Sequence, residues 1–225
     1  MAQALAESIF DVLYLTFAIF IGIFLIVKGG KGSLVQKFGI MAIVLGAGDS
    51  FHLVPRALAL WTTGLEANAA ALGIGKLITS VTMTIFYLIL YYIWRERYQI
   101  QGRKGLTVTM WVLAALRVAL CAFPQNQWLT YHQPLLWGIL RNIPFAIMGI
   151  LLIVVFAQEA QRANDRVFSF MWLAITLSFL FYLPVVLFAE VFPLVGMLMI
   201  PKTLAYVWIV VMGPNLYLQT KKQQS

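Results

Sequence analysis

Charged residues are scarce in this chain. They make up 11% of the 225 residues, while hydrophobic residues make up 62% and the mean hydropathy is +0.88. Soluble domains carry about 25% charged residues. The composition therefore argues against a water-soluble domain and indicates a protein whose surface lies in a lipid bilayer.

Cysteine and histidine are also scarce, which limits the chemistry available. Cys121 is the only cysteine, so the chain forms no intrachain disulfide. The two histidines, His52 and His132, have no cysteine near them in the sequence. Because protein zinc sites are built from several Cys, His, Asp or Glu ligands, we expect no metal site, and nothing in the sequence indicates a cofactor.

Seven apolar stretches are each long enough to cross a bilayer, which takes about 20 residues in a helix. The N-terminus lacks the basic segment and small-residue cleavage site of a signal peptide, so we expect the first stretch to be retained as a helix. The stretches take up most of the chain, which predicts an all-α, seven-helix transmembrane bundle forming a single domain over residues 1–225. The predicted spans are residues 8–27, 38–61, 72–94, 106–123, 135–157, 167–189 and 194–218.

The Lys and Arg residues are distributed unevenly along the chain. Of sixteen, eleven lie in the C-terminal tail and in alternate connections, and the other connections have none. By the positive-inside rule this predicts a multi-pass protein of the cell membrane with an extracytoplasmic N-terminus and a cytoplasmic C-terminus. The net charge of +8 is then a topology signal that favours anionic membrane lipids as partners, and we expect no nucleic-acid partner. The eleven are Lys28, Lys31, Lys37, Arg95, Arg97, Arg103, Lys104, Arg162, Arg166, Lys221 and Lys222.

The other five cations lie inside predicted spans. A charge at the centre of a membrane helix costs about 2.5–3.5 kcal/mol, and such residues usually face the bundle interior. The acids at similar depth are Asp11, Asp49 and Glu190, so five cations face three acids and cannot all be paired. This predicts a water-filled cavity or an anion site in the extracytoplasmic half of the bundle. The cations, on the second, third, fourth, fifth and seventh spans, are Arg56, Lys76, Arg117, Arg141 and Lys202.

Two purely structural interpretations of these cations compete with an anion site. Some of the five can form interhelical salt bridges. Arg56 and Lys76 can also extend their charged ends to lipid headgroups at the membrane surface.

The second span carries the most specific pattern. Asp49, His52 and Arg56 follow an i, i+3, i+7 spacing that places them on one helix face. Gly46 and Gly48 would let a neighbouring helix approach closely. An Asp–His pair one turn apart can act as a catalytic base and its orienting partner, or it can be a buried hydrogen-bonded pair without chemistry.

Further polar residues lie at compatible depths and are candidates for binding a ligand. Asn142 follows Arg141, and Tyr206 lies one turn beyond Lys202. Tyr182 is the candidate from the sixth span, whereas we assign Tyr14 to the aromatic belt at the membrane interface.

The cytoplasmic half of the predicted bundle is almost entirely apolar. Residues 17–27, 108–116, 147–156 and 207–212 contain no ionisable side chain. No ionisable side chain continues from the cationic layer to the cytoplasm, which argues against a path for a transported polar solute.

A weak internal similarity suggests that the first three spans are repeated as the last three. Residues 17–19 and 145–147 both read Phe-Ala-Ile, and the repeats would have the same orientation, a parallel 3+1+3 arrangement. This topology is similar to that of SWEET-type sugar transporters, the KDEL receptor and rhodopsins. No signature of these families covers the chain.

The sequence leaves several functions open. One is a membrane-embedded enzyme that binds an anionic lipid or phosphate-bearing substrate through its cations, with Asp49 and His52 as catalytic residues. Another is a receptor or transporter for a small anionic molecule. A retinal protein with Lys202 as Schiff-base amine is a remote alternative, since Leu198 replaces the expected aspartate four residues earlier. Of these we favour the enzyme, with the receptor or transporter as the alternative.

Overall fold

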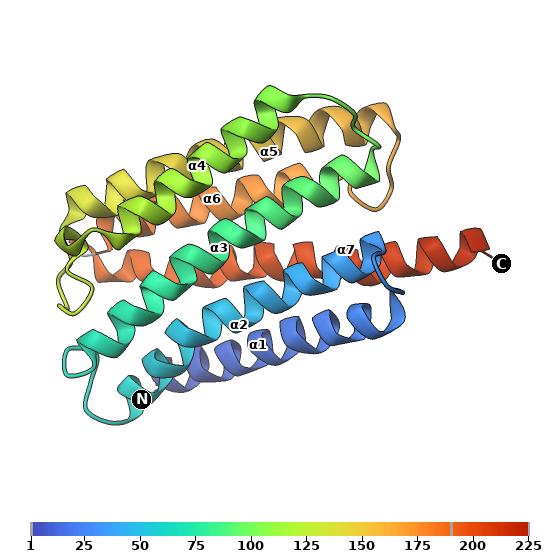
Figure 1. Cartoon of the computed structure of the whole chain (residues 1–225). Coiled ribbons are helices and arrows are strands. Elements are labelled where there is room, and N and C mark those ends of the chain that lie inside the picture. Colours follow the sequence, from blue (N-terminus) through green and yellow to red (C-terminus); the bar gives the residue numbers. More distant parts are fainter. Residues whose placement is uncertain (1, 190, 225) are drawn as a thin grey trace.

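The computed structural model describes residues 2–189 and 191–224, which form seven long α-helices and no strand (Figure 1). Glu190, one of the acids expected near the cationic layer, lies outside the described residues. The helices are α1 (Ala2–Lys28), α2 (Leu34–Trp61), α3 (Ala69–Arg97), α4 (Lys104–Ala122), α5 (Leu135–Arg162), α6 (Met171–Phe188) and α7 (Met199–Gln224). Two short 3-10 helices, η1 (Pro124–Asn126) and η2 (Pro193–Leu198), precede α5 and α7.

Each predicted span corresponds to one helix, and all seven are long and apolar enough to cross a membrane. The ends differ where local hydrogen bonding decides them. α6 begins at Met171 rather than at residue 167, because the Asp165 carboxylate accepts hydrogen bonds from the backbone N–H groups of Val167 and Phe168 and holds them in a turn. α7 begins at Met199 because the residues before it form η2.

The helices form one bundle in which consecutive helices pack side by side, and α7 closes it against α1 and α2. The two termini lie at opposite ends (Figure 1). We call these the N-terminal end, where α1, α3, α5 and α7 begin, and the C-terminal end, where they finish. All eleven cations of the tail and connections lie at the C-terminal end.

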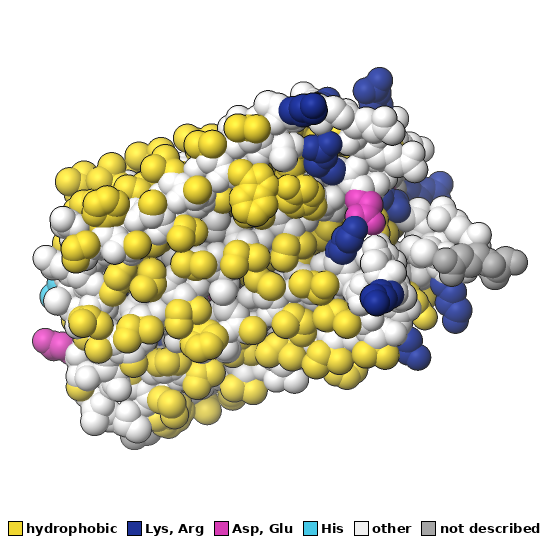
Figure 2. All heavy atoms as spheres, in the orientation of Figure 1, with side chains coloured by type: hydrophobic (Ala, Val, Ile, Leu, Met, Phe, Trp, Pro, Cys, Tyr) yellow, Lys and Arg dark blue, Asp and Glu magenta, His cyan; other side chains and the backbone are white. Residues whose placement is uncertain are grey.

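The flank of the bundle is covered with apolar side chains. Figure 2 shows hydrophobic side chains along the whole flank that it displays, while Lys and Arg gather at the end where α7 finishes. Side chains such as Leu13 and Phe20 are about two-thirds exposed, at 65% and 66%. A surface of this kind is stable against lipid hydrocarbon rather than water.

Glycines set the spacing of the helices around α2. A Cβ at Gly46 would meet Ala18 and Ile19 of α1, and one at Gly48 would lie 2.1 Å from Thr82 Oγ1 of α3. The predicted close approach at these two glycines is confirmed. A third contact, at Gly75 of α3, lies against the backbone of α2, where a Cβ would be 2.8 Å from His52 Cα.

The C-terminal half of the bundle is filled by large apolar and aromatic side chains. Phe86, Leu90 and Trp94 of α3 are fully buried, and the Trp94 indole N–H donates to the Val155 carbonyl of α5 at 3.1 Å. Nearer the N-terminal end, the Phe145 ring packs on that of Tyr87 with centroids 4.8 Å apart. This aromatic packing separates the polar half of the bundle from the C-terminal half.

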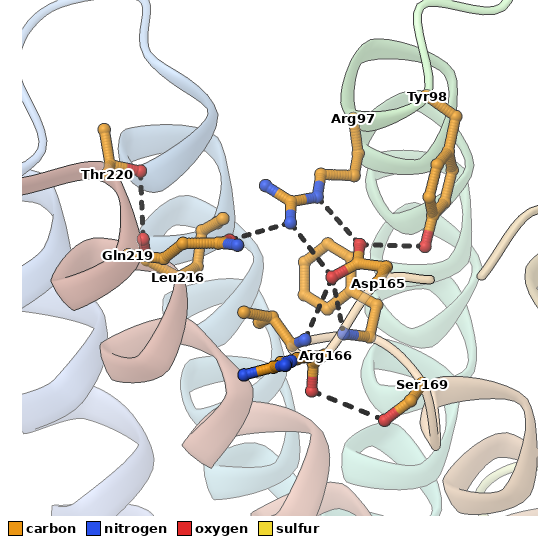
Figure 3. Close-up of polar contacts among 10 residues, drawn as sticks. Arg97, Tyr98, Asp165, Arg166, Ser169, Leu216, Gln219 and Thr220 are labelled. Atoms are coloured by element: carbon orange, nitrogen blue, oxygen red, sulfur yellow. Dashed lines mark hydrogen bonds and ion pairs between the residues drawn. The ribbon is translucent and has the colours of Figure 1, made fainter. Parts of the chain in front are cut away.

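A polar cluster ties three elements together at the C-terminal end (Figure 3). Arg97 at the end of α3 donates from Nε and Nη2 to the two oxygens of Asp165, at 2.8 and 2.9 Å. The same Nη2 donates to Gln219 Oε1 of α7 at 2.7 Å, and the Tyr98 hydroxyl donates to Asp165 at 3.0 Å. α3, the α5–α6 connection and α7 are therefore joined by one network.

Candidate functional site

A cavity of about 380 Å³ lies at the N-terminal end of the bundle, and each of the seven helices contributes side chains to its lining. It brings together every candidate residue that the sequence singled out, although these residues lie far apart along the chain. They are Asp49, His52, Arg56, Lys76, Arg117, Arg141, Asn142, Tyr182, Lys202 and Tyr206. Their roles stay predictions.

Arg117 is the only residue of α4 that lines the cavity. It is 2% exposed, and its guanidinium carbon lies 3.5 Å from the centroid of the Phe145 ring, a cation–π contact. Its buried Nε and Nη1 have no hydrogen-bond partner among the described residues. A buried donor without an acceptor costs about 1–3 kcal/mol, and more when it is charged, so this guanidinium lacks the acceptors that its charge requires.

Lys202 projects from the second turn of α7 and is 8% exposed. Its Nζ lies 5.2 and 5.4 Å from the ring centroids of Tyr182 and Tyr206. Among the described residues Lys202 forms no salt bridge, and its charge is stabilised by the two rings and by the longer-range attraction of the Asp49 carboxylate. The ammonium group is a second cation available to an anion in the cavity.

Arg141 is held by the connection between α4 and α5. Its Nη1 donates to Asn126 Oδ1 at 2.8 Å, and its guanidinium lies 4.4 Å from the Trp128 ring centroid. Trp128 in turn donates its indole N–H to the Cys121 carbonyl at 2.8 Å. The sequence did not indicate Asn126 or Trp128, because they lie in a connection and reach Arg141 only through tertiary folding.

Arg56 forms a salt bridge with Glu7 of α1, at 3.0 Å. For Arg56, the structure therefore shows the interhelical salt bridge that the sequence offered as the alternative to an anion site. Glu7 lies just outside the predicted first span, which begins at residue 8, and so was not counted among the acids of the polar layer; α1 itself begins at Ala2. Anion binding consequently depends mainly on the other four cations.

Asp49 is buried and accepts a hydrogen bond from the Tyr14 hydroxyl of α1 at 2.7 Å. The assignment of Tyr14 to the interfacial belt was wrong. Its side chain is 3% exposed because it lies on the face of α1 that packs against α2. Position along a span predicts depth in the membrane but does not predict which side of the helix faces the bundle.

His52 lines the cavity, and its buried Nδ1 has no hydrogen-bond partner among the described residues. Although Asp49 and His52 share a helix face, no hydrogen bond joins them in the described part of the chain; the carboxylate turns to Tyr14 instead. The two side chains reach the cavity as separate groups.

A hydrogen bond also joins α5 and α6 at the cavity. The Tyr182 hydroxyl donates to Asn142 Oδ1 at 2.9 Å, and the Asn142 amide donates to the Gly138 carbonyl at 2.8 Å. Asn142 is thereby fixed in orientation. Within the described residues, no group of three or more His, Cys, Asp or Glu side chains is placed to hold a metal ion.

The seven apolar helices are the pattern of a multi-pass membrane protein, here with a charged cavity at one end of the bundle. Comparison of the chain with known protein families, with curated proteins and with solved structures found no significant match. What the protein does must therefore be argued from the chemistry of the cavity.

Proposed function

We propose that this protein binds an anionic group, a phosphate or a carboxylate, inside the cavity at the N-terminal end. The observation that carries the proposal is the Arg117 guanidinium, which is buried and lines the cavity, with two nitrogens that lack an acceptor. Burying an arginine without an anion is costly. With a rotation of the Arg117 side chain that turns these nitrogens toward the cavity, a bound phosphate or carboxylate would supply the missing acceptors in short, charge-assisted hydrogen bonds.

The electrostatics of the cavity support the proposal. The lining carries five cations and three acids, Glu7, Asp11 and Asp49, so its formal charge is net positive; beside Arg117 and the paired Arg56, the cations are Lys76, Arg141 and Lys202. Charges attract an anion more strongly in a bundle interior than in water because the effective dielectric constant is lower. An anion at this site would therefore be held by several cations at once.

The proposed site faces the extracytoplasmic side, which follows from the expected orientation of the chain in a cell membrane. A receptor and a membrane-embedded enzyme both fit such a site, with Asp49 and His52 acting on the ligand in an enzyme. The apolar C-terminal half disfavours a transporter. The 3+1+3 repeat and the single-domain organisation stay predictions.

Replacing Arg117 tests the proposal. Purified protein in lipid nanodiscs is titrated with inorganic phosphate and with acetate by isothermal titration calorimetry. We expect Arg117→Gln to weaken binding of the preferred anion about 10- to 100-fold, since a hydrogen bond to a charged group is worth about 1.5–3 kcal/mol.

Arg162→Gln is the matched control, because Arg162 is an exposed arginine at the opposite end of the bundle. This variant should bind like the wild type. The proposal is wrong if the wild type binds neither anion, or if the two variants bind equally well.

A further inference from the structure

The cavity lining is not uniformly polar. Apolar side chains reach it from α1, α2, α3 and α5, among them Phe10, Leu53 and Phe145. A larger group of aliphatic and thioether side chains comes from the end of α6, η2 and the first turn of α7. These are Val185, Val186, Ala189, Met197, Met199 and Ile200. We call them the apolar rim.

The apolar rim lies nearer the end of the bundle than the key cation. Val186 lies two residues before the end of α6, about 3 Å at 1.5 Å per residue. Arg117 lies five residues before the end of α4, about 7.5 Å by the same measure. On α6 itself, Val186 lies one turn nearer the end of the helix than Tyr182, whose ring contacts Lys202, so a ligand that reaches this ammonium along α6 passes the rim first.

The rim is continuous with the outer surface of the bundle. Met197 lines the cavity and is also 54% exposed. Beside it in the α6–α7 connection, Val191, Phe192 and Leu194 are 68%, 61% and 80% exposed. This row of apolar side chains leads from the flank of the bundle, where lipid is expected, to the mouth of the cavity.

A small hydrated anion gains nothing from an apolar rim, because its only useful contacts are with the cations. An anion attached to an alkyl chain gains from both parts of the cavity. Each methylene group that the rim buries is worth about three- to fourfold in affinity.

We propose that the bound anion is the headgroup of an amphiphile supplied by the bilayer. Arg117 and Lys202 hold the headgroup, and the alkyl chain leaves along the apolar rim and the α6–α7 connection. This inference rests on the proposed function, since it names the class of ligand that the anion site takes.

Alkyl phosphates test the inference because they carry one phosphate and one chain of chosen length. Inorganic phosphate, ethyl phosphate, butyl phosphate and hexyl phosphate are titrated against the protein in nanodiscs by isothermal titration calorimetry, with empty nanodiscs as the blank. We expect the affinity to rise about three- to fourfold for each methylene group that the rim covers, and to fall about 10- to 100-fold for every probe in Arg117→Gln.

Val186→Thr puts a hydroxyl group on the rim at nearly constant side-chain volume, and Ile200→Thr puts one there with the loss of the terminal methyl group. Each is expected to remove much of the gain from chain length while leaving inorganic phosphate binding unchanged, which also shows that the variant is folded. Leu187→Thr is the control, because Leu187 is exposed and does not line the cavity.

The outcomes separate the two proposals. Equal affinity for inorganic phosphate and hexyl phosphate, with both weakened to the same degree in Arg117→Gln, overturns the amphiphile and leaves the anion site standing. A gain with chain length that survives both rim substitutions also overturns it, because the chain then binds elsewhere. No binding of any probe to the wild type overturns both proposals.

Discussion

Asp49 is the side chain for which the structure most restricts the possible chemistry. One carboxylate oxygen accepts the Tyr14 hydroxyl hydrogen bond, and no hydrogen bond links the group to His52 among the described residues. A catalytic role would therefore use Asp49 with Tyr14 as its orienting partner, and His52 as a separate group. The distinction matters because a base is effective only when its partner holds it in position.

Replacing Asp49 with Asn separates an enzyme from a receptor. In an enzyme, Asp49→Asn is expected to lower turnover about 10²- to 10⁴-fold, the contribution of a positioned general base, while anion binding persists. Product formation is followed by mass spectrometry of a lysophosphatidate incubated with the purified protein, and binding by calorimetry with inorganic phosphate. A wild type that binds this lipid and leaves it unchanged contradicts catalysis on it and favours a receptor.

Arg56 and Arg117 show how two arginines in similar sequence contexts differ in the fold. Arg56 has Glu7 as a partner across the α1–α2 contact. Arg117 has the Phe145 ring and two unsatisfied nitrogens. Both were candidates from the sequence, and only packing separates the paired side chain from the one that needs a ligand.

The connection between α5 and α6 is short, but through Asp165 it forms hydrogen bonds that join elements of the bundle. Asp165 accepts hydrogen bonds from Arg97, from Tyr98 and from two backbone N–H groups at once (Figure 3). Burial of the carboxyl group acts to raise the pKa of Asp165, but the hydrogen bonds and the charge of Arg97, together with the backbone N–H groups, outweigh it and lower that pKa below its usual value. The ionised carboxylate therefore stabilises the contact between these elements.

This contact is expected to make stability depend on pH. Because the folded-state pKa of Asp165 lies below that of the unfolded chain, its stabilisation is fully present above the unfolded value of about 3.9 and is lost as the pH falls through the folded value. Asp165→Asn should cost about 1.5–3 kcal/mol at pH 7. The midpoint of thermal unfolding in detergent, followed by tryptophan fluorescence, should fall in the variant, and its difference from the wild type should shrink below pH 4.

Arg166→Gln serves as control for this experiment, since Arg166 is the exposed neighbour of Asp165. Its unfolding midpoint should match that of the wild type at every pH. A difference between Asp165→Asn and the wild type that does not change with pH would show that the carboxylate charge is not the source of the stability.

The two ends of the bundle differ in charge, and this difference predicts how the protein is oriented in the membrane. The connections at the N-terminal end contain no Lys or Arg, whereas eleven cations lie at the other end. The positive-inside rule then predicts that the N-terminal end and its cavity face away from the cytoplasm.

Cysteine labelling in intact cells tests this orientation. Because Cys121 is the only cysteine, Cys121→Ala provides a background for single cysteines. Glu66 and Arg166 are exposed residues at opposite ends of the bundle. A membrane-impermeant maleimide should label Glu66→Cys in intact cells and Arg166→Cys only after the membrane is disrupted, and the reverse pattern would show that the cavity opens to the cytoplasm.

The sequence by itself determined the seven apolar helices, because hydropathy over about 20 residues is a local property that needs no knowledge of neighbours. It also indicated that the charged residues within the spans face the bundle interior, although it missed Glu7 and misplaced Tyr14. Charges are too costly in hydrocarbon to face lipid, so Lys202 and Arg117 had to turn inward wherever the helices packed. Both side chains line the cavity.

Only the tertiary structure decided which of these groups are paired. Tyr14 reaches Asp49, Glu7 reaches Arg56 and Asn126 reaches Arg141, and Arg117 is left without an acceptor among the described residues. Such pairings depend on how each helix is rotated about its axis and how far it slides along its neighbour. Those two quantities are set by side-chain packing across helix contacts, such as Gly48 against Thr82, between residues that are distant in the sequence.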